Sequence, residues 1–174
     1  SERFAVGLWV GRTATANTLE QVKRLILEYK NNAAKTAPSP FPLVSCPWCG
    51  EPLGRDSLTL VPSPSKPEAV VVGGSSFRCD FSARQNKEGL PVLFVDEQIY
   101  RELPSFLVAT VDKFAMLPWR GETGMLFGRV AARQGARFYG PLDLVPKLAS
   151  PLPDGLRPPE LIVQVATGGF APRE

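Results

Sequence analysis

The sequence predicts a mixed α/β fold in which a parallel sheet carries a small, loop-rich insert. Three short apolar runs, LPVLFVD, SFLVATV and ELIVQVA, are continuous and do not alternate with polar residues. This pattern is typical of strands that are buried on both faces of a parallel sheet. Residues 36–87 differ, because prolines and glycines interrupt every long element there and the motif CPWCG is typical of a zinc ribbon.

The first predicted elements are a strand and a helix. Residues 4–16, FAVGLWVGRTATA, predict an apolar strand that runs into a turn. The segment NTLEQVKRLILEYKNN predicts an amphipathic helix, with Thr18 and Gln21 placed as a capping box at its start. Its apolar positions at helical spacing are Leu19, Val22, Ile26 and Tyr29.

A second strand and helix are predicted in ELPSFLVATVDKFAMLPW, residues 102–119. We expect residues 106–111 to form a buried strand, Asp112 to cap the helix that follows, and Pro118 to end that helix. A purely structural role in the fold would be enough to explain this segment. Its small polar and basic groups nevertheless follow a strand of a parallel sheet, and the carboxyl edge of such a sheet is where open α/β folds bind ligands.

Composition narrows the class of protein. The chain has 174 residues and a net charge of +3, which permits an acidic partner such as nucleic acid but does not demand one. Histidine is absent, so a hydrolase with a Ser-His or Cys-His pair is excluded. There is no run of 18 apolar residues, so we expect no membrane span and a cytoplasmic location.

The cysteines predict a metal site. Cys46 and Cys49 lie in CPWCG, and Cys79 lies in a second short turn, so an odd number of thiols accompanies a CxxC motif. In a reducing compartment this pattern favours zinc over a disulfide framework. Thiol redox chemistry is less favoured, because GEPLG after the motif cannot open a helix. Inert buried thiols remain an alternative.

A closed structural zinc site needs a fourth ligand, which the sequence does not identify. Asp80 is adjacent to Cys79, so simultaneous ligation by both would be sterically awkward. Glu51 and Asp56 lie closer to the CxxC motif and could supply an oxygen.

Several motifs in order resemble one protein family. They are GLWVGRTATANTL, CPWCG, LPVLFVDEQIYRELPSFLVATVDKFAMLPWRGETGMLFG and LRPPELIVQ, and together they cover about residues 7–164. This series resembles the helicase subunit of the DISARM anti-phage system and its relatives, a branch of superfamily 2 helicases with a cysteine-rich insert in the first RecA-like domain. The resemblance implies a partial RecA-like domain at 1–35 and 88–165, the insert at 36–87, and an unmatched tail at 166–174.

The resemblance also implies functional residues. ATVDKFAML occupies the place of the motif that contacts the nucleic-acid backbone in such helicases, which assigns this role to Thr110, Asp112, Lys113 and Phe114. The full-length family uses ATP and Mg²⁺. This chain has no GxxxxGK[ST] loop, and VATGGFAPRE follows LIVQ where the family carries an acidic box. We therefore expect a truncated, internal piece of a helicase that is inactive as an enzyme by itself.

A basic pattern lies further along the chain. GRVAARQGARF places Arg129, Arg133 and Arg137 at i, i+4 and i+8, which predicts one face of a helix that tolerates Gly135. This face could contact phosphates, or it could simply be solvated. Nearby aromatic side chains could stack on bases or belong to the core. They are Trp119, Phe127 and Phe138.

The predicted function is that of a helicase-derived piece that binds DNA or RNA without sequence specificity and holds Zn²⁺ in its insert. Other subunits of the defence system are further expected partners, and a membrane is not. Two alternatives stay open. One is a zinc-stabilised module that contacts protein and not nucleic acid, and the other is a metal-free remnant without function.

Overall fold

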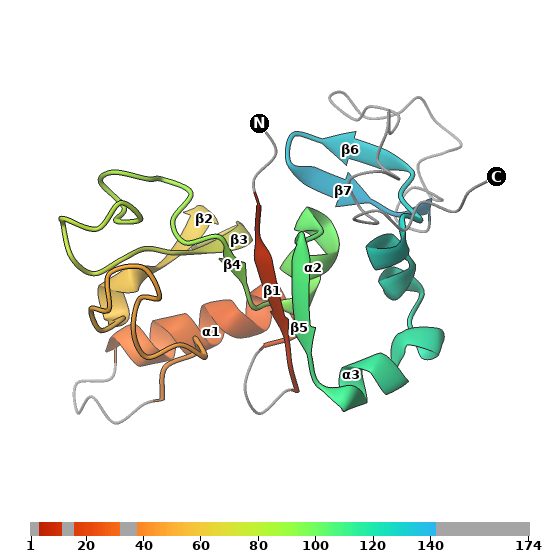
Figure 1. Ribbon diagram of the computed structural model, residues 1–174, viewed down its shortest axis with the longest axis horizontal. Coiled ribbons are helices and arrows are strands. Elements are labelled where there is room, and N and C mark those ends of the chain that lie inside the picture. Colours follow the sequence, from red (N-terminus) through yellow and green to blue (C-terminus); the bar gives the residue numbers. More distant parts are fainter. Residues whose placement is uncertain (1–3, 12–15, 32–37, 142–174) are drawn as a thin grey trace.

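The computed structural model shows a mixed α/β fold around a three-stranded parallel sheet. The described residues are 4–11, 16–31 and 38–141. The sheet has the order β4-β1-β5, with β1 (Val6–Trp9) between β4 (Val92–Leu93) and β5 (Phe106–Ala109) (Figure 1). The predicted parallel sheet is thereby confirmed for the runs LPVLFVD and SFLVATV. The run ELIVQVA lies outside the described residues.

The first helix follows the prediction closely. Helix α1 (Leu19–Asn31) buries the predicted apolar face and begins with the predicted capping box. The Gln21 backbone N–H donates to Thr18 Oγ1 at 3.2 Å, and the Thr18 N–H donates to Gln21 Oε1 at 3.4 Å. The Leu19 N–H donates to Glu97 Oε2 at 2.9 Å, which joins the start of α1 to the start of α2.

The segment after β4 differs from the prediction in two respects. Helix α2 (Asp96–Glu102) leads to β5, which ends at Ala109 and is not buried, since Phe106 is 59% and Val108 44% exposed. In the described residues β5 has only β1 as a neighbour, so part of its side-chain surface stays in solvent. The cap of the next helix is Thr110 and not Asp112, because the helix starts at Val111, two residues earlier than predicted.

Three short helices follow β5 in the described residues. They are α3 (Val111–Ala115), η2 (Leu117–Trp119) and η3 (Gly121–Phe127). None of the helices in the described ranges has both the length and the apolar character needed to cross a lipid bilayer.

The arginine-rich segment forms a hairpin, so the predicted helix was wrong. Strand β6 (Ala132–Gln134) pairs with β7 (Arg137–Tyr139) in antiparallel register. The two residues between the strands include Gly135, whose φ of +59° is the left-handed conformation that a helix cannot contain. Arg129 precedes the hairpin, Arg133 lies on β6 and Arg137 on β7, so the three side chains do not share a helical face.

The cysteine-rich insert contains the short helix η1 (Arg55–Ser57) and a hairpin of β2 (Leu58–Pro62) and β3 (Pro67–Val72). It packs on α1 and shares its hydrophobic core, which runs from Val22 and Ile26 of α1 to Val70 and Val72 of β3. A second buried cluster lies around Trp9 of β1, with residues of α2, η3 and β7. Among the described residues, the insert therefore shares one apolar core with α1.

Candidate metal centre

The CxxC motif folds as a tight knuckle at the base of a short loop. An antiparallel bridge between Ser45 and Pro52 closes the loop, and the Cys46 N–H donates to the Glu51 carbonyl at 2.8 Å. The Gly50 N–H donates back to the Cys46 carbonyl at 2.9 Å. Gly50 has a φ of +77°, so the turn that follows the second cysteine needs a residue without a Cβ.

Cys79 reaches the same point from the other side of the insert, after β3. The Gly74 N–H donates to the Phe81 carbonyl at 2.9 Å, which folds the segment carrying Cys79 back onto the end of β3. Gly74 lies directly against the cysteine, because a Cβ built on it would be 2.5 Å from Cys79 Sγ and 2.9 Å from Cys79 Cβ. A side chain at residue 74 is therefore incompatible with the observed position of this sulfur.

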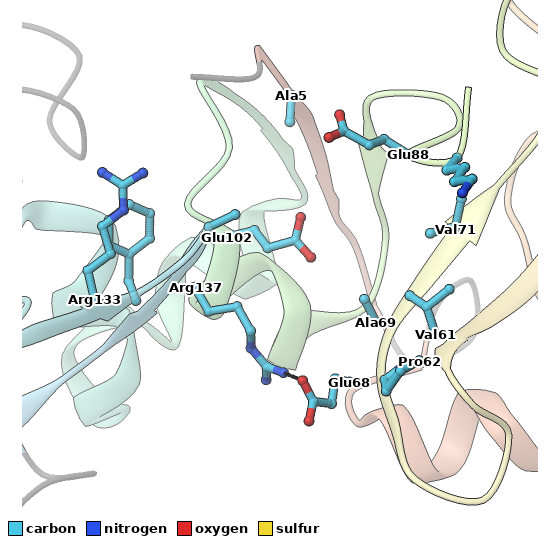
Figure 2. A pocket seen from close by; sticks show the side chains of 13 residues that line it. Ala5, Val61, Pro62, Glu68, Ala69, Val71, Glu88, Glu102, Arg133 and Arg137 are labelled. Atoms are coloured by element: carbon cyan, nitrogen blue, oxygen red, sulfur yellow. Dashed lines mark hydrogen bonds and ion pairs between the residues drawn. The ribbon is translucent and has the colours of Figure 1, made fainter. Parts of the chain in front are cut away.

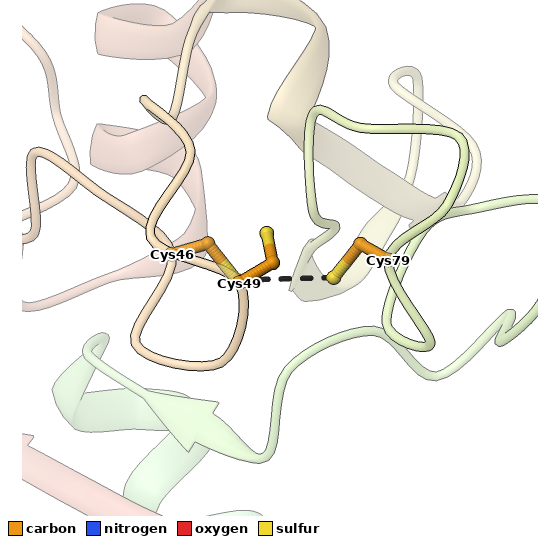
Figure 3. Close-up of side chains that lie close together, drawn as sticks. All are labelled: Cys46, Cys49 and Cys79. Carbon is orange, nitrogen blue, oxygen red and sulfur yellow. Dashed lines mark hydrogen bonds between the residues drawn. The ribbon is translucent and has the colours of Figure 1, made fainter.

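The three sulfurs converge in one place, as Figure 3 shows. All three lie within 4.8 Å of one another, and Cys46 Sγ is 3.9 Å from Cys79 Sγ. A tetrahedral zinc site with Zn–S bonds of about 2.3 Å places its sulfurs ~3.8 Å apart. All three cysteines are free thiols, with Cys46 and Cys79 buried and Cys49 exposed. The arrangement can therefore hold a soft divalent metal ion.

The two buried thiols differ in acidity. Burial works against ionisation of Cys46, but backbone N–H groups of Cys49 and Trp48 hydrogen-bond its sulfur, and the pKa of Cys46 falls below the ordinary value. Burial, with the neighbouring sulfurs Cys49 and Cys46, raises the pKa of Cys79 to about 11. Of the two buried thiols, Cys46 is therefore the one that ionises more easily.

An aromatic contact connects the two turns. The Trp48 ring, from the CxxC motif, meets Phe81 edge to face with 5.4 Å between centroids. Trp48 Nε1 also donates to Asp80 Oδ2 at 3.0 Å, so this carboxylate is engaged by the indole. Among the described residues the three sulfurs form a group by themselves, which includes neither Glu51 nor Asp56.

The residues proposed to contact nucleic acid divide between two places. Thr110, Asp112, Lys113 and Phe114 follow β5 at the carboxyl edge of the sheet. Lys113 is not presented to solvent, because Nζ forms an ion pair with Asp96 and lies 5.6 Å from the centre of the Trp9 ring. The side chains of Lys113 and Asp96 are only 13% and 3% exposed. This pair ties α3 to the start of α2.

A cavity of about 550 Å³ opens at this carboxyl edge. Its wall includes Thr18 at the start of α1 and Asp96 at the start of α2, together with Arg120 and Arg129. Sequence reasoning found Arg129 but missed Arg120 and Asp96. The position of Asp96 directly after the apolar run LPVLFV was a usable signal, since a residue that follows a parallel strand lies at the carboxyl edge.

Arg133 and Arg137 line a different cavity, of about 780 Å³, at the amino end of β1 (Figure 2). Arg137 is held there by an ion pair with Glu68 of β3, with 2.7 Å between Nη1 and Oε2. Ala5, just before β1, lines the same space. The predicted stripe of three arginines is therefore split, with only Arg129 near the carboxyl edge.

Comparison with known proteins identifies a relative of this chain. No protein-family model matches the sequence. Over 137 residues the chain is 34% identical to "DISARM protein DrmA" from Bacillus paralicheniformis. The matched segment is 73% of this chain and 11% of that protein, so the chain spans about a ninth of the length of the relative. The similarity confirms the predicted resemblance: the chain is a relative of a segment of the DISARM protein DrmA.

Proposed function

We propose that this chain forms a nucleic-acid-contacting part of a DISARM helicase-type protein, with a zinc-stabilised insert. In this proposal residues 1–35 and 88–165 belong to a RecA-like domain and residues 36–87 form the insert. The similarity to DISARM protein DrmA carries the proposal. The parallel sheet is compatible with it, and ATP and Mg²⁺ would act in the full-length protein.

The carboxyl edge is the part of the surface that we assign to the nucleic acid. Arg120 and Arg129 line the cavity there and can donate charge-assisted hydrogen bonds to backbone phosphates. Glu97 and Glu122 line the same cavity, which limits its positive charge and favours weak binding. The buried ion pair of Lys113 gives it a positioning role, because it holds α3 against α2 beside the arginines.

The metal that fits the three thiolates best is Zn²⁺. Thiolates are soft ligands, and tetrahedral sulfur sites are typical of zinc. The ion would connect the CxxC turn to the turn of Cys79 and so fix the two loops that cover the end of the β2–β3 hairpin. Its role in this proposal is structural: it holds the insert against α1.

Salt-dependent binding tests the nucleic-acid proposal. We expect weak, sequence-independent binding to single-stranded DNA or RNA, because backbone phosphates are the target. The double variant Arg120→Gln/Arg129→Gln should flatten the slope of log K against log salt by about 1.4, at ~0.7 per contact. The double variant Arg133→Gln/Arg137→Gln changes the net charge equally and is the matched control. Equal slopes for both variants and the parent chain would contradict the assignment.

A protein-binding module is the second candidate function, and one observation favours it. Several apolar side chains after β5 are exposed: Val111 is 80% and Trp119 81% exposed, and Phe114 and Phe127 are exposed as well. Exposed apolar surface of this kind is common at protein interfaces. The same titration separates the two functions, because a protein-binding module would not bind nucleic acid even at low salt.

A further inference from the structure

The turn that carries Cys79 has the same spacing as the CxxC turn, with a serine in the place of the first cysteine. The first turn is Cys46-Pro-Trp-Cys49, and the second is Ser76-Phe-Arg-Cys79, so a serine stands where the first cysteine of a second CxxC motif would be. Zinc ribbons take two ligands from each of two such turns. Spacing alone would be weak support, but the hydrogen bonds agree with it.

Ser76 accepts the same kind of hydrogen bond as Cys46. In the first turn, backbone N–H groups of Trp48 and Cys49 hydrogen-bond the sulfur of Cys46. In the second turn, the Arg78 N–H donates to Ser76 Oγ at 3.3 Å, which is the equivalent bond from the residue two positions later. The Cys79 N–H donates to the Ser76 carbonyl at 3.0 Å and closes the turn.

Burial also distinguishes Ser76 from its neighbours. Ser76 is half-buried, whereas Ser75 and Phe77 on either side of it are exposed. A neutral serine hydroxyl is not among the usual zinc ligands, which are thiolate, imidazole and carboxylate. The chain contains no histidine, and no carboxylate of the described residues joins the sulfur group.

We propose that Ser76 marks the fourth coordination position of this centre. The metal is held by Cys46, Cys49 and Cys79 and keeps that position for a ligand from outside the chain. Water would occupy that position at rest, and a monodentate imidazole or thiolate would replace it. Three protein ligands and one exchangeable position are the arrangement of an open zinc site and not of a closed structural one. This inference rests on the proposed metal centre.

Cobalt(II) titrations of the full chain test the open position. The visible absorption bands of bound Co²⁺ report the number and type of its ligands. In the parent chain, imidazole added to the Co²⁺-loaded protein should shift these bands. In Ser76→Cys a fourth thiolate closes the site, so imidazole should have no effect, and Zn²⁺ affinity in competition with a chelator should rise at least about tenfold. Phe77→Cys adds a thiol to the same turn at an exposed position and should behave as the parent chain does.

The outcomes separate this inference from the metal proposal. If the parent chain binds metal, and its Co²⁺ bands ignore imidazole, the open position is wrong although the metal centre stands. A Ser76→Cys affinity no higher than that of Phe77→Cys would also overturn the assignment of the fourth position. Metal binding by Ser76→Cys but not by the parent chain would overturn the native metal centre and, with it, the exchangeable position. If neither the parent chain nor Ser76→Cys binds metal, both proposals fail.

Discussion

A substitution at Gly74 tests the metal centre, because Gly74 lies against the proposed ligand Cys79 but is not itself a ligand. In Gly74→Ala the new Cβ would lie 2.5 Å from Cys79 Sγ, while ordinary van der Waals contact begins at 3.4 Å. The sulfur must therefore move by roughly 0.9 Å, and metal sites tolerate deviations of only about 0.2 Å in ligand distance. We expect the Zn²⁺ affinity to fall by about 10–100-fold, the range typical of losing a group that orients a ligand.

Gly73→Ala is the matched control for this test. Its Cβ would lie 3.5 Å from the Ala83 backbone nitrogen and 3.6 Å from the Phe81 carbonyl oxygen, which is ordinary contact. Zn²⁺ affinity is measured by competition with a chromophoric chelator, and circular dichroism checks that both variants fold. Overpacking alone costs about 1–3 kcal/mol of stability. Equal Zn²⁺ affinities for the two folded variants would refute the idea that Cys79 is a ligand in the observed geometry.

Two further predictions concern the carboxyl edge and the enzymatic activity. Asp96→Asn should lower the free energy of unfolding by about 3–5 kcal/mol in chemical denaturation, because it leaves the buried charge of Lys113 unpaired. The double variant Asp96→Asn/Lys113→Met should recover much of that loss, and no recovery would mean that the pair is not the cause. The chain as given should show no nucleic-acid-stimulated ATP hydrolysis and no Mg-ATP affinity in calorimetry, since it has no GxxxxGK[ST] loop. Turnover above an enzyme-free control would contradict this expectation.

Short sequence motifs correctly predicted those features of the fold that depend on neighbouring residues. Thr18 and Gln21 form their capping box within one turn of α1, so both partners could be identified from the local sequence. The apolar runs at β4 and β5 correctly indicated parallel strands. The convergence of the CxxC motif with Cys79 was also predicted in outline, because a CxxC motif with one further cysteine is a spacing typical of metal ligands.

The prediction for the arginine-rich segment failed because it relied on helical periodicity and ignored turn chemistry. Arg129, Arg133 and Arg137 have helical spacing, but Gly135-Ala136 between short strands is also the pattern of a two-residue hairpin loop, and the positive φ of Gly135 decides for the hairpin. The apolar run of β5 predicted a buried strand, but Phe106 and Val108 are exposed, so an apolar run alone does not establish burial. The sequence also did not indicate that Lys113 pairs with Asp96, because the two residues are far apart along the chain and meet only when the sheet has formed.

The position of the insert within the chain has a consequence for the folding rate. Val6 of the central strand pairs with Val92 and with Phe106, so the sheet cannot form until the chain has closed a loop that contains α1 and the whole insert. Such non-local pairing slows folding, and closure costs more as the loop grows. A metal ion bound early would join Cys46 to Cys79, which are 33 positions apart, and remove that stretch from the loop. Zinc would then accelerate assembly of a sheet that it does not touch.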